Sequence, residues 1–287
     1  MNVSVVITSS HEPRTIGLAL KTILKQDSSR IKEIMVVAPD KETLAAAKKV
    51  TTNPKVKLIK DQGKGKPAAL NLAFQKASAE ILVLTDGDVY LGKNSLTDLL
   101  SLFEDPSVGG ISGRPISANS RNTLLGFWSH FLTEAAHQTR LSRFNKGQFL
   151  ELSGYLLAIK KKLVQEIPAS TLADDLYLSQ LVAKAGEKTA YQPKAEVFVN
   201  YPTTLTDWFK QKRRSAYDYW KTDLQSGRSP LEEVIDGLKL GLTCPQNIRE
   251  FLWLILLFGA RLILWLEIFF LRLFGKRSLW QRVETTK

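Results

Sequence analysis

The stretch Ile81-Leu82-Val83-Leu84-Thr85-Asp86-Gly87-Asp88 runs from an apolar segment into two acids that are separated by one glycine. The apolar segment predicts a buried strand, and the Asp-Gly pair is typical of a turn at its end. Alternate residues of an extended chain project in one direction, so the two carboxylates can converge on one point. A divalent cation there would relieve their repulsion, and the plain alternative is a solvated turn.

Further apolar runs precede this stretch, and helical patterns separate them. The predicted strands are Val3–Thr8, Glu33–Ala38, Val56–Lys60 and Ile81–Thr85, and the predicted helices are Arg14–Gln26, Lys41–Val50 and Pro67–Ala77. This alternation predicts an α/β, Rossmann-like fold with a mostly parallel sheet flanked by helices. Ligands of such sheets bind at the carboxyl ends of the strands, which here are Thr8–Glu12, Pro39–Asp40, Asp61–Lys66 and Asp86–Asp88.

The net charge indicates which kind of partner the protein binds, and the cysteine content bears on its cellular compartment. The 287 residues include 40 Lys and Arg against 28 Asp and Glu, a net charge of +12, which predicts an anionic partner. The sequence shows no recognisable nucleic-acid-binding motif, so we expect no nucleic-acid partner. The single Cys244 excludes an intramolecular disulfide, and no secretory signal opens the chain. We therefore expect the N-terminal part to face the cytosol.

A second acidic pair stands farther along the chain. Gln148–Ile159 reads as a strand interrupted at Gly154, and Asp174–Ala185 reads as a helix that begins with Asp174-Asp175. Acids in a first helical turn are favoured by the helix dipole, so capping is one reading of this pair. A functional role for one member of the pair is the other reading.

Four motifs follow one another along the chain: an opening strand followed by Glu12, a second strand ending near Asp40, the segment Gly65-Lys66-Pro67-Ala68-Ala69-Leu70-Asn71, and Asp86-Gly87-Asp88. In this order they resemble the motifs of the family 2 glycosyltransferases, which have the GT-A fold, and the resemblance covers residues 3–219. The resemblance implies a nucleotide-diphosphate sugar as donor, and we expect a UDP-sugar. It also implies Mn²⁺ or Mg²⁺ as cofactor.

The same resemblance implies roles for single residues of the donor site. Thr8, Glu12 and Asp40 would line the pocket for the base and ribose. Lys66 would approach the base or diphosphate, and Asp88 would bind the metal, with Asp86 beside the metal or the ribose. The alternatives are an exposed loop acid for Glu12, a helix N-cap for Asp40 and a solvated lysine for Lys66.

In the second acidic pair the family carries Glu-Asp, so Asp174 stands where Glu is usual, and Asp175 matches the general base. A base is needed because an acceptor hydroxyl attacks well only as its proton leaves. Ser153-Gly154 resembles the segment that flanks the acceptor site, together with Asp174, and a glycine bulge in a strand is the alternative. One displacement inverts the anomeric centre, so we expect an inverting enzyme.

Gln211-Lys212-Arg213-Arg214-Ser215 resembles the Gln-x-x-Arg-Trp motif of cellulose and hyaluronan synthases. Gln211 and Arg214 match and would contact the donor. Ser215 replaces the Trp that helps to hold the acceptor sugar, which argues against processive synthesis. The surrounding residues 208–221 interleave cations with aromatic residues, a pattern that suits an interfacial helix, with a plain solvated helix as the alternative.

The most apolar run, Phe251–Phe274, has the length of a membrane span, but Arg261, Glu267 and Arg272 interrupt it. Glu250, Arg261 and Arg272 recur every eleven residues and therefore fall on nearly one line of a helix. We expect a helix with a narrow polar stripe that lies in the interface at the cytoplasmic face of the membrane, and single-pass insertion is the alternative.

Together these features predict a catalytic domain over residues 1–222 and a membrane-associated helical region over residues 223–287. The expected function is inverting sugar transfer from a nucleotide sugar to a lipid-linked or polysaccharide acceptor at the cytosolic membrane face. The alternatives are a basic nucleic-acid-binding protein and a membrane scaffold that kept the fold and lost the reaction.

Overall fold

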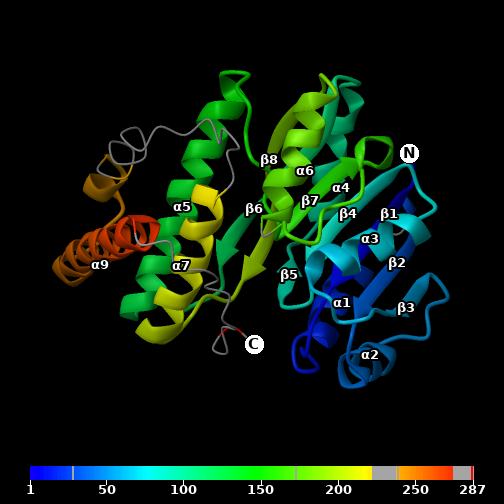
Figure 1. The fold of residues 1–287 in the computed structure, drawn as a ribbon, viewed down its shortest axis with the longest axis horizontal. Helices are drawn as coiled ribbons and strands as arrows, with labels where there is room; N and C mark the ends of the chain where they lie inside the picture. Colours follow the sequence, from blue (N-terminus) through cyan, green and yellow to red (C-terminus); the bar gives the residue numbers. More distant parts are fainter. Residues whose placement is uncertain (28, 172, 222–236, 238, 274–285, 287) are drawn as a thin grey trace. The chain divides into compact units, whose positions relative to one another are not determined.

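The computed structural model describes residues 1–27, 29–171, 173–221, 237, 239–273 and 286, and it divides into two compact units (Figure 1). The first unit comprises Met1–Ile116 and Arg140–Val199, and the second comprises Ser117–Thr139 and Asn200–Lys287. The chain passes from one unit to the other at residues 116–117, 139–140 and 199–200, and the second of these points lies within the long helix α5 (Leu124–Asn145). The first unit carries the sheet, and the second is built mainly from helices.

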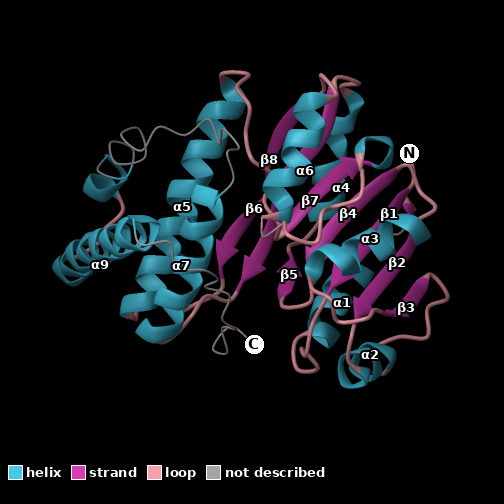
Figure 2. Ribbon diagram, viewed as in Figure 1, coloured by secondary structure: helices cyan, strands magenta, loops and turns pink. Residues whose placement is uncertain are grey.

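Within the described residues the sheet has eight strands in the order β3-β2-β1-β4-β7-β6-β8-β5 (Figure 2). The strands are β1 (Val3–Thr8), β2 (Ile31–Ala38), β3 (Val56–Lys60), β4 (Ile81–Asp86), β5 (Val89–Leu91), β6 (Val108–Ser117), β7 (Leu156–Lys160) and β8 (Lys188–Val199). Strands β1 to β4 pair in parallel, whereas β7 pairs antiparallel with β4 and β6, and β5 pairs antiparallel with β8. The predicted α/β fold with a mostly parallel core is confirmed.

Two helices cover one face of this sheet. Helices α3 (Lys66–Lys76) and α6 (Asp174–Lys184) share a hydrophobic cluster with alternate residues of the strands. Its members include Leu70, Ala73 and Phe74 of α3, Leu178, Leu181 and Val182 of α6, and Val6, Met35, Leu82 and Leu157 of the sheet. Each fully buried aliphatic side chain contributes about 1.5–3 kcal/mol, so this cluster holds both helices against the strand ends.

Three more α-helices of the first unit connect strands that follow one another in the chain. Helix α1 (Ile16–Leu24) contacts α2 (Lys41–Lys48), and α4 (Ser95–Ser101) packs against β8. Two short 3₁₀ helices, Leu102–Glu104 and Lys161–Leu163, complete the first unit. The four helices predicted in the first unit and the four predicted parallel strands begin and end within two residues of the observed ones.

The predicted strand Gln148–Ile159 is wrong over most of its length, because only Leu156 onward forms β7. Consecutive backbone N–H groups before β7 donate to side chains instead of to a neighbouring strand. Leu152 N donates to Ser179 Oγ at 2.9 Å, and Ser153 N donates to Ser112 Oγ at 2.9 Å. Leu150 and Leu152 of this segment are buried at alternate positions, which explains why the pattern resembles that of a strand.

The second unit has its own aromatic core. Helices α7 (Leu205–Lys221) and α9 (Ile248–Leu273) pack with the first part of α5 around Phe127, Trp128, Phe131, Trp208, Leu254 and Leu257. The rings of Trp128 and Trp208 lie 5.0 Å apart, and Trp128 Nε1 donates to the carbonyl of Trp253. Trp208 thus belongs to the core rather than to an interfacial surface. The side chains of Tyr217, Tyr219 and Trp220 lie outside the described residues.

Candidate active site at the strand ends

The carboxyl ends of β1 and β4 bring two of the predicted donor-site residues together. Thr8 pairs in register with Asp86, and Thr8 Oγ1 donates to Asp86 Oδ1 at 3.1 Å. The backbone N–H of Gly87 donates to the carbonyl of Thr8 at 2.9 Å. The chain therefore turns immediately after Asp86, at the edge where ligands of parallel sheets bind.

Lys66, at the first turn of α3, lies between two acids. Its Nζ is 2.8 Å from Asp86 Oδ1 and 3.6 Å from Asp174 Oδ2. Burial opposes the charge of Lys66, but the carboxylates of Asp174 and Asp86 outweigh burial and raise the pKa of Lys66. The lysine stays protonated and links α3 to β4 and α6, so the reading of Lys66 as one more solvated lysine is wrong.

Asp174 and Asp175 occupy the first turn of α6, and both are partly buried. Burial raises the pKa of Asp174 to about 6, with Lys66 acting against it and Asp175 adding to it. Burial also raises the pKa of Asp175, against the opposing effects of Lys66 and of the hydrogen bonds from Leu176 and Gly154. A carboxylate with a raised pKa is a better proton acceptor near neutral pH than an exposed one.

Gly154 holds Asp175 in place. Its backbone N–H donates to Asp175 Oδ2 at 3.1 Å, and a Cβ at this position would lie 3.3 Å from that oxygen. The backbone carbonyl of Asp175 accepts from Ser179 Oγ at 2.6 Å. Ser153 and Gly154 thus lie in a loop against Asp175, which corrects the alternative of a glycine bulge within a strand.

Glu12 is buried rather than exposed, with 7% of its surface accessible. Its Oε2 accepts from Ser9 Oγ at 2.6 Å, and its backbone N–H donates to Thr43 Oγ1 at 2.9 Å. A Cβ on Gly87 would lie 2.3 Å from Ser9 Oγ and 2.8 Å from Glu12 Oε2. The glycine between Asp86 and Asp88 is therefore required by this close approach.

Asp40 is the N-cap of α2, as the alternative reading held. Its Oδ1 accepts from Thr43 N at 2.8 Å, and its Oδ2 accepts from His11 N at 2.8 Å. Burial would raise the pKa of Asp40, but the hydrogen bonds from Thr43 and His11 outweigh burial and lower it. The cap ties the loop after β1 to the loop after β2.

The donor set fits a divalent cation that is shared with a ligand. Asp86 ends β4 and half-buried Asp88 follows two residues later. No group of three His, Cys, Asp or Glu side chains within the described part of the chain could hold a metal alone. Mg²⁺ in proteins is commonly held by one or two carboxylates together with phosphate oxygens. The two acids match that arrangement, with the remaining ligands left to a diphosphate and water.

Gln211 and Arg214 belong to α7 of the second unit. Gln211 Oε1 is buried and lacks a hydrogen-bond partner among the described residues. Their predicted contact with the donor stays a prediction.

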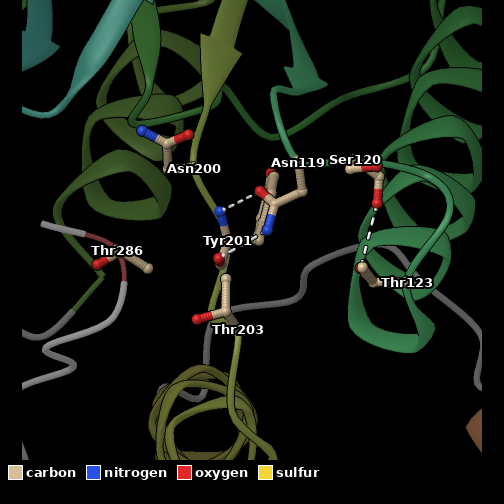
Figure 3. A pocket seen from close by; sticks show the side chains of 7 residues that line it. All are labelled: Asn119, Ser120, Thr123, Asn200, Tyr201, Thr203 and Thr286. Carbon is tan, nitrogen blue, oxygen red and sulfur yellow. Dashed lines mark hydrogen bonds between the residues drawn. The ribbon is translucent and has the colours of Figure 1, made fainter.

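The second unit also contains a cavity of about 340 Å³ whose lining carries no charged side chain among the described residues (Figure 3). It is lined by Asn119, Ser120, Thr123, Asn200, Tyr201, Thr203 and Thr286. The Asn119 amide donates to the Tyr201 carbonyl at 3.0 Å and accepts from Tyr201 N at 2.8 Å. None of the predicted site residues lines this cavity.

Sequence reasoning missed the side chains that hold the site loops. Thr43, Ser112 and Ser179 accept from backbone N–H groups of residues 12, 153 and 152. Isolated Ser and Thr residues give no signal of such long-range contacts. Asn71 does have a signal, because it closes the Gly-Lys-x-x-Ala-Leu-Asn segment.

The chain is similar to known glycosyltransferases. It is 25% identical over 213 residues to an N-acetylglucosaminyltransferase of Azorhizobium caulinodans, covering 68% of this chain and 52% of that protein. It is 26% identical over 188 residues to a hyaluronan synthase of Streptococcus pyogenes serotype M1, covering 61% of this chain and 44% of that protein. The chain thus spans about half the length of these curated relatives.

A solved structure and a family model agree with these relatives. A mannosyltransferase from Pyrobaculum calidifontis, in complex with GDP-Man and Mn²⁺, shares the fold with a TM-score of 0.62 and 20% identity, over 90% of this chain and 74% of that one. The model for "Glycosyltransferase like family 2" matches residues 1–218, well over half of the chain. The protein therefore belongs to glycosyltransferase family 2.

Proposed function

We propose that the protein transfers a sugar from a nucleotide-diphosphate sugar, expected to be a UDP-sugar, to a hydroxyl of a lipid-linked or polysaccharide acceptor. The observation that carries the proposal is the group formed by Lys66, Asp86, Asp174 and Asp175 at the carboxyl edge of the sheet. The names of the relatives support sugar transfer, and the family match over residues 1–218 supports a catalytic domain of residues 1–222.

In this proposal Thr8, Glu12 and Asp40 hold the base and ribose of the donor. Asp86 and Asp88 would hold Mn²⁺ or Mg²⁺, which when bound supplies positive charge beside the leaving diphosphate. Lys66, which is protonated, adds a fixed positive charge at the same place. Gln211 and Arg214 would complete the donor site, with Arg214 toward the diphosphate.

Asp175 is the proposed general base. The acceptor oxygen attacks the anomeric carbon while its proton passes to the Asp175 carboxylate, and the carbon–oxygen bond to the diphosphate breaks with its electron pair leaving on the nucleotide. The Gly154 N–H orients the carboxylate, and Ser153, Gly154 and Asp174 line the acceptor side. A single displacement gives inversion of configuration.

The outward face of α9 supports membrane association. One described helix, α9, is long and apolar enough over Ile248–Leu271 to cross a membrane, by length and composition. Its exposed side chains are apolar along one side: Phe251, Leu252, Ile255, Leu256, Leu262, Ile263, Leu266, Phe269 and Phe270 are 46–62% exposed. Contiguous apolar patches of this kind mark contact with a partner or a membrane.

Both acids of α9 pair with arginines elsewhere in the second unit. Glu250 is 4% exposed and bonds to Arg121 at 2.9 Å, and Glu267 pairs with Arg213 of α7 at 2.7 Å. Burial and neighbouring Arg261 lower the pKa of Lys212 to about 8. Because charged α7 packs along α9, we propose that α9 lies in the interface at the cytoplasmic face, and that residues 223–287 form the membrane-associated region.

The purified protein, reconstituted with vesicles and Mn²⁺, would be screened against a panel of nucleotide sugars and acceptors, with release of the nucleoside diphosphate as readout. We expect release with one donor class, and NMR of the product should show the inverted anomer. If no donor is turned over with any acceptor, the scaffold alternative gains support. A product that keeps the donor's configuration would exclude the single displacement.

A further inference from the structure

We propose that Asn71 is a positioning residue that fixes where α6 begins, and thereby where Asp174 and Asp175 lie. The inference rests on the proposed function for its catalytic readout, and it adds a residue to which no role in the reaction has been given. Asn71 touches neither acid and acts through the segment that precedes them.

The contact is a pair of hydrogen bonds to one backbone residue. Asn71 Nδ2 donates to the carbonyl of Ile167 at 2.9 Å, and the N–H of Ile167 donates to Asn71 Oδ1 at 2.9 Å. One side-chain amide thus satisfies both polar groups of Ile167, as a neighbouring strand would. Without it, two partly buried backbone groups would lose their partners.

The side chain of Ile167 reinforces this attachment. It is 1% exposed and belongs to the cluster that contains Leu70 and Phe74 of α3 and Leu178 of α6. Backbone and side chain of the same residue therefore join the segment before α6 to both helices.

Helix α6 needs such an attachment because its own start is weakly defined. Its N-cap is Ala173, which makes no side-chain capping bond. The described residues between Val164 and Ala173 form neither helix nor strand. Ile167 precedes Asp174 by seven residues, and on the other side Gly154 N holds Asp175. The contacts at Ile167 and at Gly154 thus bracket the acid pair.

The same helix α3 also carries Lys66, five residues before Asn71 and about 7.5 Å away along the helix axis. Lys66 contacts Asp174 and Asp86. Helix α3 therefore positions the ammonium group of Lys66 and also, through Asn71, the segment that precedes the two acids of α6. A shift of that segment would separate Asp174 from Lys66 and Asp175 from Gly154. A misplacement of about 1 Å in a catalytic group can lower the rate by about 10²-fold.

The test compares Asn71→Ala with a matched variant, Asn119→Ala, in the full-length protein. Asn119 makes the same pair of bonds, to Tyr201 in the second unit. Both variants lose two hydrogen bonds, so a similar fall in Tm is expected. Only Asn71→Ala should lower kcat, by about 10- to 100-fold, while KM for the donor and binding of nucleoside diphosphate with Mn²⁺ stay within about threefold.

Hydrogen–deuterium exchange gives a readout that is independent of turnover. Asn71→Ala should speed exchange of the backbone amides in residues 173–179, and Asn119→Ala should not. Asn71→Asp, which keeps the acceptor for Ile167 N and loses the donor, serves if the alanine variant does not fold, and the same changes are expected.

Unchanged exchange in residues 173–179, or a loss of kcat no larger than that of Asn119→Ala, would overturn the role of Asn71. A wild-type protein that turns over no nucleotide sugar would instead refute the proposed function, and the exchange comparison would still decide on Asn71.

Discussion

The two units of this protein arrange charged and apolar side chains in opposite ways. In the first unit apolar strands and helices fill the interior, and Lys66, Asp86, Asp174 and Asp175 gather at one edge of the sheet. On α9 of the second unit, Glu250 and Glu267 pair with Arg121 and Arg213 of the same unit, and the exposed side is apolar. The first arrangement is typical of a protein surface that faces water. The second is expected of a surface that contacts hydrocarbon.

The comparison separates two reasons for holding charges close together. In the first unit burial raises the pKa of Asp174 to about 6, and the carboxylates of Asp174 and Asp86 raise the pKa of Lys66, so these groups are perturbed in the way that is common at functional sites. In the second unit the ion pairs to Arg121 and Arg213 remove charge from the face turned away from the core. Substitutions in each unit should therefore fail in different assays.

The largest effect is expected from Asp175→Asn, which keeps the shape of the side chain and removes the proton acceptor. We expect kcat to fall by about 10³-fold, because a general base contributes about 10²–10⁴-fold. Donor binding should change by less than about threefold, as measured by titration with nucleoside diphosphate and Mn²⁺. The exposed acid Glu104, changed to Gln, is the control and should leave kcat unchanged. Full activity of Asp175→Asn would remove Asp175 from the mechanism.

The outward face of α9 gives the next effect. Ile263 is 59% exposed, and Ile263→Glu should weaken binding to anionic vesicles by about 10- to 100-fold, because burial of such a side chain contributes about 1.5–3 kcal/mol. Turnover of a soluble acceptor should persist. Leu18 of α1, 50% exposed in the first unit, is the matched control: Leu18→Glu should leave vesicle cosedimentation unchanged. Equal loss in both variants would contradict a membrane role specific to α9.

The charge of Lys66 should set the acid limb of the pH profile. The proposed base, Asp175, works deprotonated. Burial raises its pKa, so activity is present above that raised pKa and is lost as pH falls through it. Lys66 lowers the pKa of both acids, so Lys66→Met should move the limb of kcat to higher pH and lower kcat on the acid side by up to about tenfold. Exposed Lys64, changed to Met, is the control and should leave the limb in place. A limb that stays fixed, or moves to lower pH, in Lys66→Met would contradict this.

The parts of the fold and of the candidate site that could be predicted from the sequence are those that local sequence patterns determine. Strands β1 and β3 were predicted with their observed bounds, because short β-branched runs ended by polar residues are a local pattern. The gathering of Thr8, Lys66 and Asp86 followed from the rule that parallel strands end at one edge. The proximity of these three residues was thus predictable before any distance was known.

What could not be predicted depends on contacts far apart in the chain. Residues 148–155 have the composition of a strand, and the partners that keep Leu152 and Ser153 from pairing are Ser179 and Ser112. The stripe of Glu250 and Arg261 on α9 was expected, but periodicity does not say which side faces the protein. The amide of Asn71 reaches a residue 96 positions away. Each of these features depends on tertiary contacts that the local sequence pattern does not reveal.

The smallest effect concerns a buried acid of the first unit that lies outside the site. Glu33 of β2 is 2% exposed and accepts from Ser4 Oγ, Ser78 N and Lys57 Nζ. Burial acts to raise its pKa, but the hydrogen bonds from Lys57, Ser78 and Ser4 outweigh it and lower the pKa of Glu33 to about 2. Its stabilising effect is therefore complete above pH about 4.5, the value for the unfolded chain, and is lost as pH falls toward 2.

Glu33→Gln should lower Tm at pH 7 by about 3–10 °C, because it weakens hydrogen bonds to a charged group. Thermal unfolding followed by circular dichroism from pH 7 to pH 3 should show the difference from wild type shrinking below pH 4.5, while exposed Glu80→Gln leaves Tm unchanged throughout. Vesicle binding should not change in either variant, because neither alters α9. A Tm difference that stays constant down to pH 3 would mean that Glu33 acts through packing and not through its charge.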